Sequence, residues 1–155
     1  MDSIALREIA PDSCEAQELL KLSAQWEEEN SCYGYRKNGP SDLAGRRIFG
    51  AFEDGALAGY LLGAVEKSQS MRSIMPENTP CFEVEELYVR PERRSAGLGA
   101  ALFRYAQEQV GQEAAYITLS AVSKNYRALL RFCGWAWSCG APDCSSAYRQ
   151  KGREL

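Results

Sequence analysis

Residues 84–109 run from an apolar strand through a basic, glycine-bearing turn into an amphipathic helix, and this order constrains the fold more than any other part of the chain. Apolar side chains recur at helical spacing after the turn, as on a helix that packs against a sheet. They are Leu98, Ala101, Leu102, Tyr105 and Ala106. Successive backbone N–H groups in such a turn, together with the positive end of the helix dipole, bind phosphate groups. We therefore expect Arg93, Arg94, Gly97 and Gly99 to form an anion site.

Length and composition indicate one globular domain. The 155 residues are enough for one sizeable core and too few for two ordinary domains. Hydrophobic residues make up 45% and charged residues 25%, and no apolar run is long enough to cross a bilayer. The first residues lack the basic and apolar segments of a secretory signal. We therefore expect a cytoplasmic protein with no membrane partner.

Charge and residue types argue against several classes of function. The net charge of −3 and the lack of a basic stripe argue against nucleic-acid binding. The chain has no histidine, which excludes Ser-His-Asp and Cys-His catalysis and argues against a zinc site, so we expect no metal. The six cysteines include no Cys-x-x-Cys pair and are expected to be mostly free thiols. The local group of Arg90, Arg93 and Arg94 suits one small anion.

The remaining pattern predicts an α+β fold with a mixed central sheet flanked by helices. The expected strands span residues 4–9, 47–52, 56–65, 81–89 and 115–122, and the expected helices begin near residues 12, 98 and 125, with a short helix or turn at 41–45. Asp12 and Glu15 form a candidate capping box for the first helix. Asp54-Gly55 suits a tight hairpin turn. A strand, helix, strand crossover implies that the last two strands are parallel.

The segment Arg94-Ser95-Ala96-Gly97-Leu98-Gly99 resembles a signature of the GNAT acyltransferases, in which it binds the pyrophosphate of coenzyme A. That signature reads arginine or glutamine, x, x, glycine, x, glycine or alanine. Asn125 and Ala128 resemble the asparagine and alanine of a later helix in the family, and the resemblance covers residues 4 to about 132. A dinucleotide-binding turn would instead follow the first strand and precede an acidic residue by about twenty positions. Neither condition is met.

The resemblance implies transfer of an acetyl or acyl group from acetyl-CoA, as co-substrate, to a primary amine of a small molecule or peptide. The amine attacks directly in a ternary complex, and proximity supplies much of the rate because the thioester is already activated. In the family the backbone N–H at the position of Val89 points at the thioester oxygen. The implied coenzyme-binding residues are Leu87, Val89, Arg94, Ser95, Ala96, Gly97, Leu98, Gly99 and Asn125.

An amine acceptor must lose a proton, and a carboxylate in the strand at residues 81–89 would take it, directly or through water. Glu85 is the first candidate for this catalytic base, followed by Glu86 and then Glu83. Simple alternation puts Glu83 and Glu85 on one face and Glu86 on the other, unless the strand bulges, as the family's fourth strand usually does. Each of them is equally consistent with a solvated carboxylate at a strand edge.

Trp26, Tyr33 and Tyr35 are candidates to line an acceptor pocket, with Glu83 as a further contact, although aromatic side chains beside a loop also serve as core or lid. The acidic strand favours a cationic acceptor. Two other functions stay open: a coenzyme A-binding module with weak or no catalysis, and an interaction domain whose glycine turn is structural. The oligomeric state is also open, and a homodimer is one expectation because many family members pair through their C-terminal strands.

The C-terminal tail departs from the family pattern. The tyrosine that often protonates the leaving thiolate would fall on Phe132, or on Cys133 with a shift of one residue. Residues 133–155 show no sustained period-two apolar pattern. We therefore expect a GNAT domain over residues 1–132 and an atypical tail over 133–155. Our hypothesis is that a frameshift replaced the native end after about Phe132, and the alternative is a divergent but genuine tail.

Overall fold

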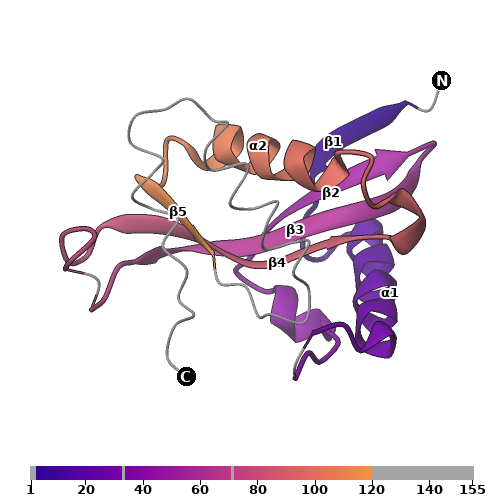
Figure 1. Cartoon of the computed structure of the whole chain (residues 1–155), viewed down its shortest axis with the longest axis horizontal. Helices are drawn as coiled ribbons and strands as arrows, with labels where there is room; N and C mark the ends of the chain where they lie inside the picture. The colour runs from indigo at the N-terminus through magenta and orange to yellow at the C-terminus, as the bar shows by residue number, and fades with distance from the viewer. Residues whose placement is uncertain (1–2, 33, 71, 120–155) are drawn as a thin grey trace.

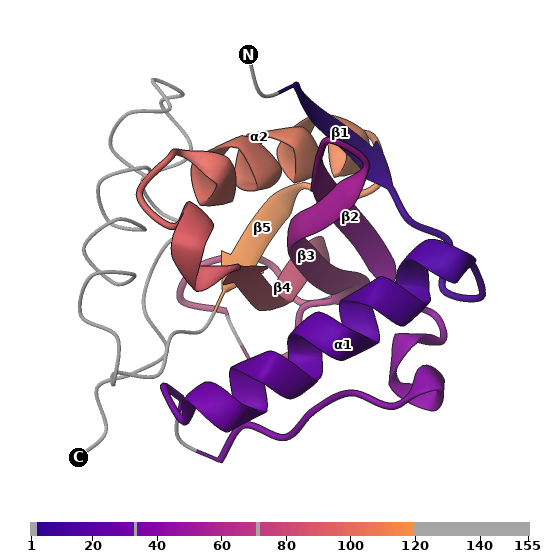
Figure 2. The same ribbon diagram turned by 90° about the vertical axis from the view of Figure 1, so that its right-hand side faces the viewer.

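The computed structural model describes residues 3–32, 34–70 and 72–119. Within these ranges five strands form one sheet in the order β1-β2-β3-β4-β5, with α1 and α2 on opposite faces (Figure 1, Figure 2). The strands are β1 (Ile4–Glu8), β2 (Arg47–Glu53), β3 (Ala56–Lys67), β4 (Pro80–Val89) and β5 (Tyr116–Leu119). The helices are α1 (Cys14–Glu29) and α2 (Leu98–Val110), with short 3-10 helices η1 (Pro40–Leu43) and η2 (Pro91–Arg93).

Strand directions confirm the predicted α+β fold with a mixed sheet. Neighbouring strands from β1 to β4 are antiparallel, and β4 and β5 are parallel, as the strand, helix, strand crossover predicts. No helix in the described ranges is long and apolar enough to span a bilayer. The helix predicted at 125–132 and the tail at 133–155 lie outside the described residues.

The start of α1 differs by one residue from the predicted capping box. Ser13, not Asp12, is the N-cap, and its hydroxyl accepts a hydrogen bond from the N–H of Ala16 at 3.3 Å. Glu15 does lie in the first turn, but its carboxylate pairs with Arg7 of β1 at 3.1 Å. Glu15, which the predicted capping box would have used, thus forms an ion pair with a residue of β1 instead.

The β2–β3 hairpin forms at the predicted dipeptide. Asp54 and Gly55 have φ values of 50° and 82°, and both lie in the left-handed region that a two-residue hairpin turn requires. The predicted short helix near residues 41–45 is present as η1. η1 precedes β2, and the turn at Asp54 and Gly55 joins β2 to β3.

The sheet separates two apolar cores. Buried side chains under α1 include Leu19, Leu22, Ile48, Phe52, Tyr60 and Leu62. Buried side chains under α2 include Phe49, Leu61, Phe82, Leu102, Phe103 and Ala106. Because successive strand residues point to opposite faces, β2 and β3 contribute to both cores, which is why their sequences are almost continuously apolar.

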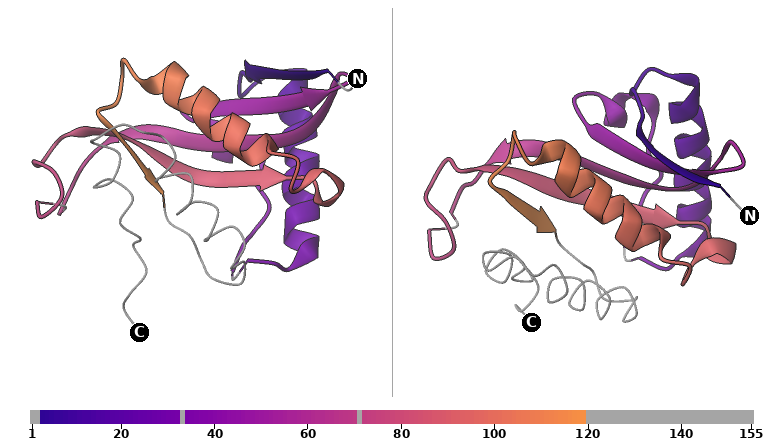
Figure 3. Two further views of the ribbon diagram at one scale, coloured as in Figure 1. Left: turned by 45° about the horizontal axis from the view of Figure 1, so that its top comes forward. Right: turned by 90° about the horizontal axis from the view of Figure 1, so that it is seen from above.

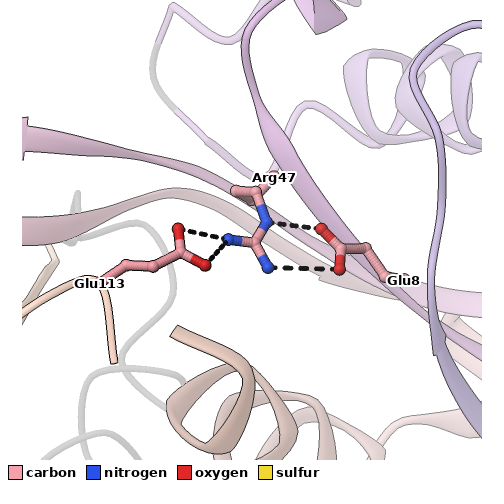
Figure 4. Close-up of polar contacts among 3 residues, drawn as sticks. All are labelled: Glu8, Arg47 and Glu113. Atoms are coloured by element: carbon pink, nitrogen blue, oxygen red, sulfur yellow. Dashed lines mark hydrogen bonds and ion pairs between the residues drawn. The ribbon is translucent and has the colours of Figure 1, made fainter. Parts of the chain in front are cut away.

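Ion pairs of one arginine connect two strands of the sheet with the end of α2. Arg47, at the start of β2, lies between Glu8 of β1 and Glu113, which follows α2 (Figure 4). Its Nε and Nη2 donate to Glu8 at 2.5 and 3.2 Å, and its Nη1 donates to both oxygens of Glu113 at 2.6 and 2.7 Å. The hydrogen bond to Glu8 is the main cause of the raised pKa of Arg47. Three segments far apart in the sequence are therefore held together.

The two halves of β4 have different surroundings. Residues 81–84 pair with β5, whereas pairing with β3 continues to Val89. Figure 3 shows β5 running at an angle to β4. Within the part of the chain that the structure describes, no strand pairs with the second half of β4 on its β5 side. The backbone groups along that stretch of edge therefore have no strand partner among the described residues.

Candidate active site

β4 bulges at its acidic residues. Leu62 of β3 pairs with Glu86 and the next residue, Gly63, pairs with Val84, so Glu85 is the extra residue between them. The bulge interrupts the alternation expected for a regular strand. Alternation therefore does not tell which way Glu85 and Glu86 face, and their contacts show it instead. The two residues have different contacts.

Glu85, the first candidate base, lies in a surface ion pair. Its carboxylate is 2.8 Å from Nε of Arg46, and the two side chains are 30% and 34% exposed. Glu83, before the bulge, is partly exposed. In this structure Glu85 is therefore engaged with a guanidinium near solvent rather than with groups of an enclosed site.

The Glu86 carboxylate lies in a part-buried group of polar side chains. The Tyr60 hydroxyl donates to its Oε2 at 2.9 Å, and the Asn38 amide donates to its two oxygens at 3.0 and 2.8 Å. The Tyr35 hydroxyl lies 3.4 Å from the same Oε2 and 2.6 Å from the hydroxyl of Ser23. These five residues are named the Glu86 cluster. They come from α1, the following loop, β3 and β4, so the site is assembled only by the fold.

Burial alters the proton affinities in the Glu86 cluster. It raises the pKa of Glu86, while the hydrogen bonds from Tyr60, Asn38 and Tyr35 act in the opposite direction. Burial also raises the pKa of Tyr35 to about 12 and raises the pKa of Tyr60. The tyrosines therefore stay protonated donors, and Glu86 becomes a better proton acceptor than a solvated glutamate.

Backbone groups at the end of β4 point to the edge that β5 leaves open. The N–H groups of successive strand residues point to alternate edges. The N–H of Arg90 donates to the carbonyl of Ala58 in β3 at 2.9 Å, so the N–H groups of Val89 and Leu87 point to the opposite edge. The Val89 carbonyl, on that same edge, accepts from Nε of Arg94 at 2.9 Å. Leu87 and Val89, both predicted to bind the coenzyme, thus have their backbone N–H groups on the edge of β4 that faces away from β3.

The glycine turn leads into α2 as predicted. Gly97 is the N-cap of α2 with φ 84°, and Ser95 has φ 71°. A Cβ on Gly97 would meet nothing within 4 Å, so the positive φ rather than crowding calls for glycine. No side chain caps the helix, and the first N–H groups of a helix, here those of Leu98 and Gly99, have no intrahelical acceptor. Such a helix start suits a phosphate group.

The arginines of the turn lie beside different carboxylates. Arg93 pairs with Glu53 at 2.5 Å and Arg94 with Glu29 at 2.8 Å. Arg90 and Arg93 also border a cavity of about 210 Å³ beside the β2–β3 hairpin. Among the described residues, no group of three or more histidine, cysteine, aspartate or glutamate side chains is arranged to hold a metal ion. The side chains of Arg93 and Arg94, expected to serve one small anion, are therefore each paired with a different carboxylate in this structure.

Aromatic side chains border the Glu86 cluster on the α1 side. Trp26 stacks on Tyr35 with ring centroids 4.1 Å apart, and on Tyr88 at 5.2 Å. Trp26 is partly buried and also packs on the α1 core. Tyr33 and Asn125, predicted to bind acceptor and coenzyme, lie outside the described residues.

Sequence reasoning missed four residues that the fold brings to the site: Ser23, Glu29, Asn38 and Tyr60. Tyr60 lies in an apolar strand and is fully buried, so its pattern indicates core. One available signal was Ser23, a polar residue on the apolar face of α1, because a buried hydroxyl needs a hydrogen-bonding partner. The position of Ser23 indicates that its hydroxyl has a hydrogen-bonding partner, but it does not identify that partner.

Comparisons with known proteins agree with the fold. The model of the acetyltransferase (GNAT) family matches residues 7–135. No curated protein sequence matches the chain. Among solved structures, the aminoglycoside N-acetyltransferase AAC(6')-Iy in complex with CoA has a TM-score of 0.72 at 12% identity, over 100% of this chain and 93% of that chain.

Two further solved structures are similar. The aminoglycoside acetyltransferase meta-AAC0020 from an uncultured soil metagenomic sample, in complex with sisomicin, has a TM-score of 0.65 at 16% identity, over 85% of this chain and 86% of that one. The ribosomal-protein-alanine N-acetyltransferase of Brucella melitensis biovar Abortus 2308 has a TM-score of 0.62 at 16% identity, over 84% and 89%. At such identities these structures establish the fold alone. Because the family model spans most of the sequence, the chain belongs to the GNAT acetyltransferase family.

Proposed function

We propose that the protein is an N-acetyltransferase that moves the acetyl group of acetyl-CoA to a primary amine of a small molecule or peptide. The observation that carries the proposal is the second half of β4. There the N–H of Val89 faces an edge without a strand partner among the described residues, and the Glu86 carboxylate lies in a part-buried polar cluster. The glycine turn and the start of α2 follow directly.

The groups at this strand end fit acetyl-CoA. The start of α2 offers backbone donors for the pyrophosphate, and the N–H groups on the open edge of β4 would bind the pantetheine arm and the thioester oxygen. The residues proposed for coenzyme binding are Leu87, Val89, Arg94, Ser95, Ala96, Gly97, Leu98 and Gly99, together with Asn125. When bound, acetyl-CoA supplies an activated acyl group on a thiol whose pKa is near that of cysteine, about 8.5.

Glu86 is the general base in this proposal, ahead of Glu85. The acceptor amine is mostly an ammonium at neutral pH, with a pKa of about 10, and gives one proton to Glu86 directly or through water. The neutral nitrogen then forms a bond to the thioester carbon while the N–H of Val89 stabilises negative charge on the oxygen. The carbon–sulfur bond breaks and the electron pair leaves with sulfur. The nitrogen then loses its second proton to solvent, which leaves the neutral amide, and the thiolate takes a proton from solvent.

The acceptor would lie on the α1 side, beside Trp26 and Tyr35. Stacked aromatic rings next to a carboxylate favour a cationic amine carried on a ring or an apolar body. The names of the similar structures include aminoglycoside acetyltransferases and a ribosomal-protein-alanine N-acetyltransferase. Aminoglycosides and peptides with a free N-terminal alanine therefore belong in the first acceptor panel.

A coenzyme A-binding protein with weak or no catalysis is the second candidate. It is favoured by Phe132, which stands where many family members have the tyrosine that protonates the leaving thiolate. A thiol leaving group with a pKa of about 8.5 departs without that acid, only more slowly. Release of free thiol with the acceptor panel separates the two candidates.

Calorimetric titration with acetyl-CoA tests the coenzyme site, with desulfo-CoA and adenosine 3′,5′-bisphosphate as controls. Binding that depends on the pyrophosphate supports the proposal, and no binding by a folded sample rejects it. For the base, we expect Glu86→Gln to lower kcat by about a hundredfold, since general base catalysis contributes at least that much. Glu85→Gln is the matched control, with a change of less than about twofold expected for a surface ion pair. Equal losses in the two variants would reject Glu86 as the base.

A further inference from the structure

The last turn of α1 contacts the glycine turn through one carboxylate. Glu29, the final residue of α1, has a side chain only 20% exposed. It accepts hydrogen bonds from the Tyr88 hydroxyl and from Nη2 of Arg94, whose nitrogen lies 3.1 and 2.8 Å from the two carboxylate oxygens. Tyr88 belongs to β4, and Arg94 opens the glycine signature. Three segments of the site thus meet at Glu29.

Arg94 is held from several sides. Its Nε donates to the Val89 carbonyl at 2.9 Å, and its Nη2 contacts Glu29. Its Cζ lies 5.4 Å from the centroid of the Tyr88 ring. A planar guanidinium with two bonded nitrogens and a ring beside it has little freedom to rotate. Glu29, Tyr88 and Val89 therefore set the position of Arg94.

Arg94 contacts the residue whose N–H is the proposed donor to the thioester oxygen, which is Val89. The N–H and carbonyl of one strand residue point to the same edge, so the carbonyl that Arg94 holds and the N–H assigned to the thioester oxygen belong to the same residue. A change in the position of Arg94 would tilt this strand end. Glu29 is thereby linked to the edge where the thioester binds.

Glu29 is poorly placed for the stability of α1 itself. The C-terminal end of a helix carries partial negative charge, so carboxylates in the last turn are unfavourable there. Glu27, Glu28 and Glu29 end α1 in sequence, and the last turn has no basic residue. Arg94 supplies the missing positive charge from another segment. The benefit of this glutamate therefore lies in its contact with the glycine turn.

We propose that Glu29 is a positioning residue for the coenzyme site: it holds Arg94 so that the end of β4 and the glycine turn keep their binding geometry. Glu29 acts through Arg94 and does not touch the substrate. The inference rests on the proposed function, because it takes the glycine turn as the coenzyme A site. The opposing model, in which Glu29 withholds Arg94 from the phosphates, predicts an affinity change of the opposite sign.

Titration of coenzyme A into Glu29→Gln and Glu28→Gln distinguishes these models. Glu28 is an exposed carboxylate in the same turn, so both variants lose the same charge near an anion site. Charge loss alone leaves coenzyme A affinity unchanged or tightens it. We expect Glu29→Gln to raise the Kd for coenzyme A by roughly three- to tenfold, in the lower part of the range for coupled groups in contact, and Glu28→Gln to change it by less than about twofold. Unchanged or tighter binding by Glu29→Gln would overturn the proposal.

A double-mutant cycle tests whether Glu29 acts through Arg94. Arg94→Gln keeps a residue type that the signature permits, and in that background Glu29→Gln should have no further effect on the Kd. Additive effects would overturn the route through Arg94. If Glu29→Gln does not fold, Glu29→Asp keeps the charge and shortens the reach, and it should weaken binding by a smaller factor, whereas wild-type affinity would overturn the proposal. Failure of the wild-type protein to bind coenzyme A would instead reject the proposed function.

Discussion

Replacing Gly63 by alanine should force β3 and β4 apart at the bulge. Gly63 pairs with Val84, immediately before the extra residue. A Cβ built on Gly63 would lie 2.3 Å from the carbonyl oxygen of Glu83 and 2.7 Å from Cζ of Phe82. The first neighbour is backbone, and the Phe82 side chain is fully buried. Neither can move aside by a simple side-chain rotation, so the strands themselves must shift.

The size of the effect follows from that short distance. Ordinary Cβ contacts begin near 3.4 Å, about 1 Å more than the 2.3 Å available at Gly63. Overpacking of this kind costs roughly 1–3 kcal/mol, and a broken ladder hydrogen bond adds about 1 kcal/mol. The smaller conformational entropy of unfolded alanine returns about 0.5 kcal/mol. We expect a net loss of about 1.5–3.5 kcal/mol, which lowers the Tm of a domain of this size by roughly 3–14 °C.

Thermal unfolding followed by circular dichroism measures this loss, and thiol release below the transition measures its effect on the site. The matched control is Gly39→Ala, because Gly39 has φ −98° and its added Cβ would meet its nearest neighbour at 3.6 Å. Gly63→Ala should also lower kcat, since a shift of β4 displaces Glu86. A Tm within about 2 °C of the Gly39→Ala variant would refute the reasoning, because it would mean that the strands absorb the extra carbon without strain.

Three further predictions concern pH, charge and the tail. Burial raises the folded-state pKa of Glu86 above its unfolded value of about 4.3, so the stability that Glu86 contributes is fully present below the unfolded pKa and is lost as pH rises through the folded pKa. Glu86→Gln should therefore gain stability relative to wild type as the pH rises above about 4.3, measured by urea titrations at a series of pH values, and a pH-independent difference would contradict the raised pKa. Arg47→Met should cost about 1 kcal/mol at low ionic strength and less in about 1 M salt, since the side chains of Arg47, Glu8 and Glu113 are 25%, 42% and 50% exposed. A salt-independent loss would point instead to packing of Arg47 near the Phe49 ring. Sequencing the gene around the codon for Phe132 tests the frameshift: an alternative frame that is closed or lacks a strand-like pattern would reject it.

The elements that were predicted correctly depend on local chemistry. The hairpin at Asp54-Gly55 and the helix after Gly97 follow from positive-φ turn residues and from periodicity, both of which are visible within a few residues. The helix cap was wrong by one residue because Asp12 and Ser13 are both good N-caps. A contact between Glu15 and Arg7 of β1 distinguishes them, and only the fold brings that pair together.

The choice among the acidic residues of β4 could not be predicted because it depends on strand register. The run from Glu83 to Glu86 holds three carboxylates, and the pairing of β3 with β4 decides which of them meets Tyr60. Asn38 likewise comes from a loop whose course no periodicity describes. The roles of Tyr33 and Asn125 and the nature of the tail stay predictions.

One extra residue in β4 connects the separate parts of the proposed site. If β4 paired with β3 without the bulge, Glu85 would stand opposite Leu62 and every later residue would move one place along the ladder. The N–H and carbonyl of Val89 would then turn towards β3, where those of Arg90 now lie. The open edge would lose its donor, and Arg94 would lose the carbonyl that it holds. The proposed base, the proposed backbone donor and the arginine contact therefore depend on the same local insertion, and Gly63 is the residue that gives it room.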